Sequence, residues 1–273
     1  MNVSILTPGF LVFLVEQSEL YFDLFRLQEA SNVVNNVINH LISENYDVHR
    51  MKAKDRWYIC IIQYNNEAQI VTSGFLSDLD ENPASFEKKE MTFSDGVGGY
   101  FKQYVDAPLW ISPVFGKKQV NMKSAFIYAE ELINQWILER PNTPTPLIIN
   151  ISSGIPYYEG KEVSGCREDV IDIVNRIKNY DIHIFNLILG GKENVVFPLS
   201  NNEIYDEKTR FVYELSTGVP SNFNYPYNRW RNKEYGTTLI DEGAKLLCNN
   251  NIVENLMSFI DCQYCPHTGQ YDG

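Results

Sequence analysis

Four apolar runs, each about as long as a buried strand, are spaced along the chain. They cover residues 10–15, 57–64, 146–151 and 182–189. Continuous apolar runs of this length are typical of strands that are covered on both faces. Strands that alternate with helices pair in parallel through right-handed crossovers. The pattern therefore predicts an α/β fold with a doubly wound, mostly parallel central sheet and helices on both faces.

The segments between the apolar runs carry helical periodicity. Leu24 and Leu27 begin an apolar stripe with spacings of three and four that continues to residue 43. The same reasoning predicts four further helices, over residues 123–138, 168–179, 206–216 and 252–259.

Three further segments complete the expected secondary structure. Residues 68–75 follow the second apolar run after a polar turn, which predicts a hairpin and one antiparallel edge strand. Residues 195–198 should form a short strand. Residues 78–117 mix charges, glycines and prolines, and here we expect long loops with one short helix.

The chain has 273 residues and no internal repeat or low-complexity linker, so we expect one domain over residues 1–260 and a C-terminal tail over 261–273. Its 23 basic residues against 35 acidic ones give a net charge of −12. A field of that sign repels nucleic acid and anionic membranes. The sequence has no secretory signal and no bilayer-length apolar run, and its five cysteines are scattered. We therefore expect a cytoplasmic protein.

In open α/β sheets, binding sites lie at the carboxyl ends of the strands. The sequence directs attention to three loops: the one after residue 15, the one before residue 123 and the one after residue 151. Each of these loops carries a short motif.

Taken in order, these motifs resemble those of a von Willebrand factor A (VWA) domain. Residues 16–20 (Glu-Gln-Ser-Glu-Leu) are similar to that family's Asp-x-Ser-x-Ser loop, residues 119–126 to its threonine segment, and residues 149–156 to its strand ending in Thr-Asp-Gly-x-Pro. Residues 209–220 and 242–249 also resemble the bacterial branch found in tellurite-resistance-type operons. The resemblance implies a VWA or Rossmann-like fold and a non-enzymatic adaptor, acting with kinase, phosphatase or ATPase proteins in stress or defence.

The family's adhesion site holds Mg²⁺, and this sequence departs from its ligands. Leu20 and Val120 provide no side-chain oxygen, and Ser153 stands where the family has an aspartate. Mg²⁺ needs oxygen ligands with carboxylate charge. The resemblance therefore implies a degenerate site with no metal and no cofactor, although Glu16 and Ser18 leave open an unorthodox Mg²⁺-dependent site.

Without a metal, the same loops should form a protein-docking surface. Two adjacent aromatics follow the third motif, and aromatic residues dominate binding hot spots. An aromatic-rich segment at 223–230 could instead bind a partner or simply cover the sheet. The residues expected at the docking surface are Glu16, Ser18, Leu20, Val120, Asn121, Ser153, Tyr157 and Tyr158.

Two other chemistries have weaker sequence support. A hydrolase could use Ser153 or Glu16, but His183 lies within a predicted strand and is expected to be a satisfied core residue. Cys262, Cys265 and His267 have the spacing of a zinc knuckle, but there is no second pair of the kind that structural zinc usually needs. We expect them to be part of a free tail.

Overall fold

The computed structural model of the protein describes residues 2–96, 98–158 and 160–265. The elements of the main body are, in chain order, β1 (Gly9–Glu16), α1 (Leu24–Glu44), β4 (Trp57–Tyr64), β5 (Ala68–Phe75), α2 (Leu76–Glu81), α3 (Met122–Glu139), β8 (Leu147–Ser152), α4 (Val163–Ile177), β9 (His183–Ile188), α5 (Glu207–Leu215), α6 (Tyr225–Tyr235), β10 (Leu247–Cys248) and α7 (Ile252–Tyr264). Two small ribbons, β2 (Tyr46–Asp47) with β3 (Lys52–Ala53) and β6 (Ser85–Ser94) with β7 (Tyr100–Leu109), and the 3₁₀ turn η1 (Asn201–Glu203) complete the list.

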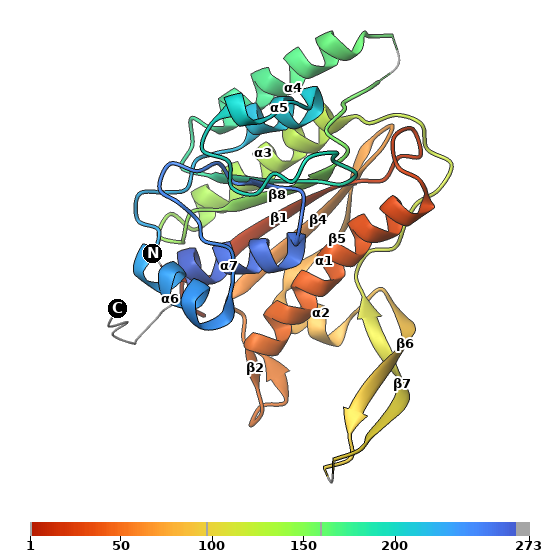
Figure 1. Ribbon diagram of the computed structural model, residues 1–273, viewed down its shortest axis with the longest axis vertical. Coiled ribbons are helices and arrows are strands. Elements are labelled where there is room, and N and C mark those ends of the chain that lie inside the picture. Colours follow the sequence, from red (N-terminus) through yellow and green to blue (C-terminus); the bar gives the residue numbers. More distant parts are fainter. Residues whose placement is uncertain (1, 97, 159, 266–273) are drawn as a thin grey trace.

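A six-stranded sheet in the order β10-β9-β8-β1-β4-β5 forms the centre of the molecule (Figure 1). Strand β1 pairs in parallel with both β4 and β8, and β9 continues the parallel arrangement to β10. Only the edge strand β5 is antiparallel, and it forms the expected hairpin with β4. These observations confirm the predicted doubly wound, mostly parallel α/β fold with one antiparallel edge strand.

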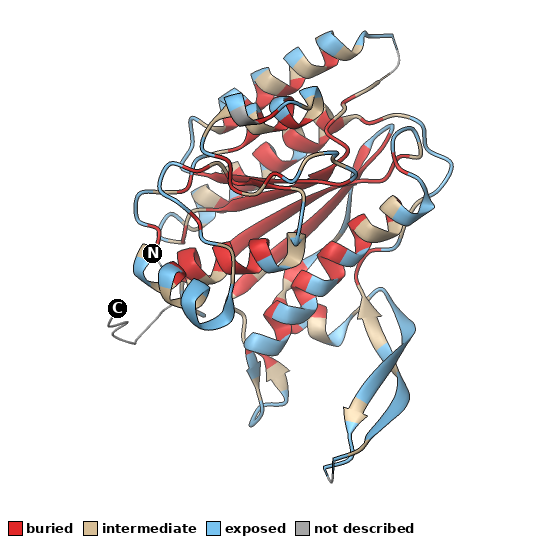
Figure 2. Ribbon diagram, in the orientation of Figure 1, coloured by how far each residue is buried: buried red, intermediate tan, exposed pale blue. Residues whose placement is uncertain are grey.

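The central strand β1 is buried along its whole length, because helices cover both faces of the sheet (Figure 2). Alternate side chains point to opposite faces of a strand. Leu11, Phe13 and Val15 therefore belong to the core formed with α1 and α7, whereas Val12 and Leu14 belong to the core under α3, α4 and α5.

Residues 78–117 were predicted to form long loops with one short helix. Helix α2 is present, but the loop prediction was wrong for residues 85–109. Strands β6 and β7 pair in unbroken antiparallel register from Ser85↔Leu109 to Ser94↔Tyr100 and project from the body as a ribbon (Figure 1). The ribbon has no buried face, and its exposed aromatics include Phe86 and Phe101, which lie on opposite faces. Sequence alternation between apolar and polar residues, the usual strand signal, is therefore absent.

One predicted strand is almost absent, and one segment to which no element was assigned forms a helix. The strand predicted at 195–198 is reduced to a single bridge between Val196 and Cys248, because Phe197 has a left-handed φ of 48° that interrupts an extended chain. The aromatic-rich segment contains helix α6, which Asn224 caps by accepting a hydrogen bond from the Tyr227 amide.

The β6–β7 ribbon should be dispensable for folding, because its hydrogen-bonded pairs join only its own two strands. We expect that deleting residues 89–105 and closing Lys88 to Asp106 with Asn-Gly will leave cooperative unfolding intact. The change in unfolding free energy should stay within about 0.5 kcal/mol, as for surface changes in general. Thermal denaturation followed by circular dichroism measures this. Loss of the cooperative transition would show that the ribbon supports the core.

Candidate docking site

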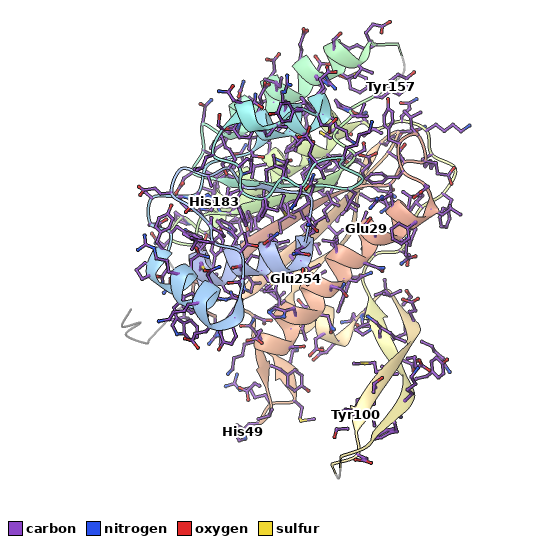
Figure 3. The ribbon with its side chains drawn as sticks, viewed as in Figure 1. Glu29, His49, Tyr100, Tyr157, His183 and Glu254 are labelled. Carbon is purple, nitrogen blue, oxygen red and sulfur yellow. The ribbon has the colours of Figure 1, made fainter. Side chains whose placement is uncertain are left out.

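The three loops singled out in the sequence do converge at the carboxyl edge of the sheet. The Glu19 amide donates to the Lys117 carbonyl at 2.7 Å, which joins the first loop to the second. Val120 and Tyr157 exchange backbone hydrogen bonds of 2.6 and 3.0 Å, which join the second loop to the third. Figure 3 shows Tyr157 at this edge. Segments up to about 140 residues apart in sequence are thus held as one surface.

Glu16, the last residue of β1, links the first and third loops through its side chain. Its carboxyl Oε2 accepts hydrogen bonds from the Ser153 amide at 2.7 Å and the Ser153 hydroxyl at 2.8 Å. Glu16 is 0% exposed, and its Oε1 has no hydrogen-bond partner among the described residues. Burial raises the pKa of Glu16 to about 8, against the lowering effects of the Ser153 hydrogen bonds and the more distant Lys208 ammonium. The side chain is therefore mostly protonated at neutral pH.

A row of buried polar side chains lies across the ends of three strands beside Glu16. The Tyr64 hydroxyl donates to Asn150 Oδ1 at 3.1 Å, and Asn150 Nδ2 donates to Asn186 Oδ1 at 2.8 Å. Asn186 Nδ2 donates to the Ser216 hydroxyl at 2.9 Å, which in turn donates to the Val212 carbonyl. Sequence reasoning missed this row. Its signal was an asparagine inside each of two otherwise apolar strands.

Most of the other predicted site residues help to hold the loops in place. Ser18 is buried, and its hydroxyl donates to the Lys117 carbonyl at 3.3 Å and accepts from the Leu20 amide at 3.2 Å. Val120 is fully buried, and Asn121 Oδ1 caps α3 by accepting from the Ser124 amide at 3.2 Å. A partner that approached this edge would not touch Ser18 or Val120 directly, whereas Asn121 is only half-buried.

The residues that cover the site include the predicted Leu20, Tyr157 and Tyr158. Leu20 is 37% exposed, and both tyrosines are half-buried. The Tyr158 hydroxyl donates to Asp169, whose carboxylate also lies 2.8 Å from the Lys161 ammonium. The hydrogen bonds from Lys161 and Tyr158 lower the pKa of Asp169 to about 2, so this carboxylate stays ionised. Burial and the hydrogen bond to Asp169 raise the pKa of Tyr158.

Exposed apolar residues that follow Leu20 in the sequence were missed. Tyr21 is next to Leu20, and Leu24 and Phe25 begin helix α1. Leu24 was predicted to face the core, but it is 64% exposed, and Phe25 is 69% exposed. The first turn of α1 extends past the edge of the sheet, so its part of the apolar stripe has no core to cover.

The arrangement does not suit hydrolysis. Ser153 is buried, and Glu16 holds the proton that a general base would have to lack. His183 begins β9 beside Leu147, the first residue of β8, and so lies at the opposite edge of the sheet from Ser153. It is a core residue, as predicted, but its Nε2 has no hydrogen-bond partner in the described part of the chain, and burial lowers its pKa to about 4.

The free tail expected from residue 261 was wrong for its first residues, because α7 continues to Tyr264 and buries Cys262. Cys265 follows the end of that helix, and His267 lies outside the described residues. Within residues 2–96, 98–158 and 160–265, no group of three or more His, Cys, Asp or Glu side chains is arranged to hold a metal ion. No helix in this part of the chain is long and apolar enough to cross a membrane.

Comparisons with known proteins add fold neighbours but no family. No protein-family model matches the sequence, and no curated protein matches it. Among solved structures, manganese-loaded TRAP of Plasmodium vivax shares 11% identity over 67% of this chain and 57% of that chain, with a TM-score of 0.39. BatB of Bacteroides thetaiotaomicron shares 13% identity over 70% and 71%, with a TM-score of 0.38. The vWF domain of the pilus tip protein Mfa5 from Porphyromonas gingivalis shares 9% over 77% and 87%, with a TM-score of 0.46. This chain thus spans little more than half of the TRAP structure.

Glu16 should make stability depend on pH. Its pKa is higher in the folded protein than the ordinary value of 4.5, so its contribution is fully present below pH 4.5 and is lost as pH rises through about 8. Each pKa unit corresponds to about 1.4 kcal/mol, so we expect the unfolding free energy to fall by a few kcal/mol between pH 6 and 9.

The matched control for this titration is Glu16→Gln, which cannot ionise. Urea denaturation of both proteins at several pH values measures the difference, because other titrating groups are common to the two. The difference in unfolding free energy between the wild type and Glu16→Gln should change with pH over this range. Parallel curves from pH 6 to 9 would contradict a buried, protonated Glu16.

Proposed function

We propose that this chain is a non-enzymatic protein-interaction module of the VWA type, which docks partners at the carboxyl edge of its sheet without a divalent ion. The observation that supports this most directly is the state of Glu16. Its carboxyl group is buried and hydrogen-bonded to Ser153, and burial raises its pKa to about 8. Such a group contributes to a preformed surface and is not poised for metal binding or for catalysis.

The residues at the metal-ligand positions do not fit Mg²⁺. A hard divalent ion needs several oxygen ligands and carboxylate charge. Val120 offers no side-chain oxygen and Leu20 none, and the hydroxyl of Ser18 is already engaged with backbone groups. Ser153 stands in place of an aspartate and donates two hydrogen bonds to Glu16. These bonds offset part of the desolvation cost of burying the Glu16 carboxyl group, a cost that a bound ion would otherwise offset.

The partners and setting in this proposal follow the sequence resemblance. The bacterial tellurite-resistance-type branch implies a cytoplasmic, multi-protein stress or defence system with kinase, phosphatase or ATPase components. The surface described above suits a protein partner, because it combines Leu20, Tyr157 and Tyr158 with the exposed Tyr21 beside Leu20. Clusters of apolar and aromatic side chains rimmed by polar ones are typical of binding sites.

The absence of a metal is directly testable. A ligand raises the melting temperature only when it binds the folded state. We expect the melting temperature to be the same with millimolar Mg²⁺, with Mn²⁺ and with EDTA, as followed by differential scanning fluorimetry. A rise with Mg²⁺ that disappears in Glu16→Ala would instead establish the unorthodox metal site at Glu16 and Ser18.

The docking surface can be tested by removing its two adjacent aromatics. We expect Tyr157→Ala with Tyr158→Ala to abolish complex formation, because truncating a hot-spot aromatic costs about 2 kcal/mol or more in binding. The backbone bridge between Tyr157 and Val120 does not need the side chain, so the fold should persist. Co-purification of tagged protein from the source cells measures assembly.

The matched control is Tyr180→Ala, which removes an exposed tyrosine just beyond the C-terminal end of α4. It should leave the complex intact. Circular dichroism confirms that each variant is folded. Equal recovery of partners by the double variant and by Tyr180→Ala would place the interface on another part of the molecule.

A further inference from the structure

A groove of about 470 Å³ lies between the outer face of α1 and the segment that enters α7. The groove is separate from the docking surface of the carboxyl-edge loops and is lined by unusually many amides. Gln28, Asn32 and Asn36 follow one another along α1, and residues 249–251, all asparagines, form the opposite wall. Gln28 Nε2 donates to Asn32 Oδ1 at 2.9 Å, which leaves Gln28 Oε1 and Asn32 Nδ2 to face a ligand. Asn32 and Asn36 are both exposed.

The spacing of the α1 amides matches that of an extended peptide. Residues four apart on an α-helix are separated by about 6 Å along its axis. In an extended chain, alternate residues point the same way and repeat every 6.4–6.8 Å or so. A side-chain amide carries both a donor and an acceptor, as does the peptide backbone. The row from Gln28 to Asn36 can therefore pair with successive alternate residues of an extended segment.

The charge of the groove selects the kind of peptide. Its charged lining residues are Glu29 on α1 and Glu254 in the first turn of α7, and no Lys or Arg lines it among the described residues. Figure 3 shows Glu29 and Glu254 on the same side of the molecule, each on its own helix. Arg26 pairs with Glu29, whereas Glu254 is exposed. Phe25 and Val253 supply apolar contact surface within the same groove.

We propose that this groove binds an extended, basic peptide segment of a partner protein. The amide row of α1 holds the peptide backbone, the exposed Glu254 attracts its Lys or Arg side chains, and Phe25 packs against intervening residues. This gives the module a second interaction surface, which does not depend on the function proposed for the carboxyl-edge loops.

The test begins with a random octapeptide library selected against the whole folded chain. We expect the selected peptides to carry Lys or Arg at alternate positions. Fluorescence polarisation then gives the affinity of the strongest peptide for each variant. Asn32→Ala should weaken binding about tenfold, which corresponds to about 1.4 kcal/mol. Glu254→Lys should weaken binding by at least as much, because it reverses the attracting charge.

Three controls make the result specific. Asn39→Ala removes an exposed asparagine on the same helix outside the groove, and should change affinity less than twofold. Tyr157→Ala with Tyr158→Ala should also leave peptide affinity unchanged, so this proposal can fail or succeed independently of the carboxyl-edge surface. Methylating alternate backbone nitrogens of the peptide should abolish binding if the amides hold its main chain.

Several results would overturn the proposal. These are selection of neutral or acidic peptides, equal effects of Asn32→Ala and Asn39→Ala, or full tolerance of backbone methylation. Failure to recover any peptide whose binding depends on Asn32 would do the same.

Discussion

Glu16 ends the central strand of the sheet with its carboxyl group fully buried, and the carboxyl edge is organised around this residue. An ionised carboxylate in such a place needs a compensating cation, whereas a protonated one needs only hydrogen bonds. Ser153 provides two of them from the neighbouring strand end, although Oε1 remains unpaired at a cost of about 1–3 kcal/mol. The same contact fixes the third loop against the first. In this arrangement an ion is unnecessary for joining the loops.

The sheet could be predicted from the sequence because its strands are covered on both faces. Burial on two sides requires continuous apolar runs, and these are visible in β1, β4, β8 and β9. The β6–β7 ribbon could not be predicted in the same way, since neither face is buried and no alternation is required of its residues. Within its sequence, only the glycines at residues 96, 98 and 99 indicated a turn. Strand signals in a sequence report burial more than they report hydrogen bonding.

The convergence of the three loops was also predictable, but the contacts of their residues were not. The order of three weak motifs was enough to bring Glu16, Val120 and Ser153 to one edge, because parallel strands end on the same side. Whether a side chain at that edge faces solvent depends on loop packing, which sequence spacing does not determine. Ser18 and Val120 are covered, whereas Leu24 is exposed beyond the core it was expected to fill.

The two proposed surfaces differ in chemistry, and this difference bears on how the proposed module would bind partners. The carboxyl edge presents Leu20 and two tyrosines, with Lys161 paired to Asp169 beside them, whereas the groove presents amides and carboxylates. Neither requires the other to change shape, since both are formed in the same structure. Two partners could therefore bind independently, and a partner that reached both would gain from effective concentration without any new contact. Modest affinity at each surface is then sufficient for stable assembly.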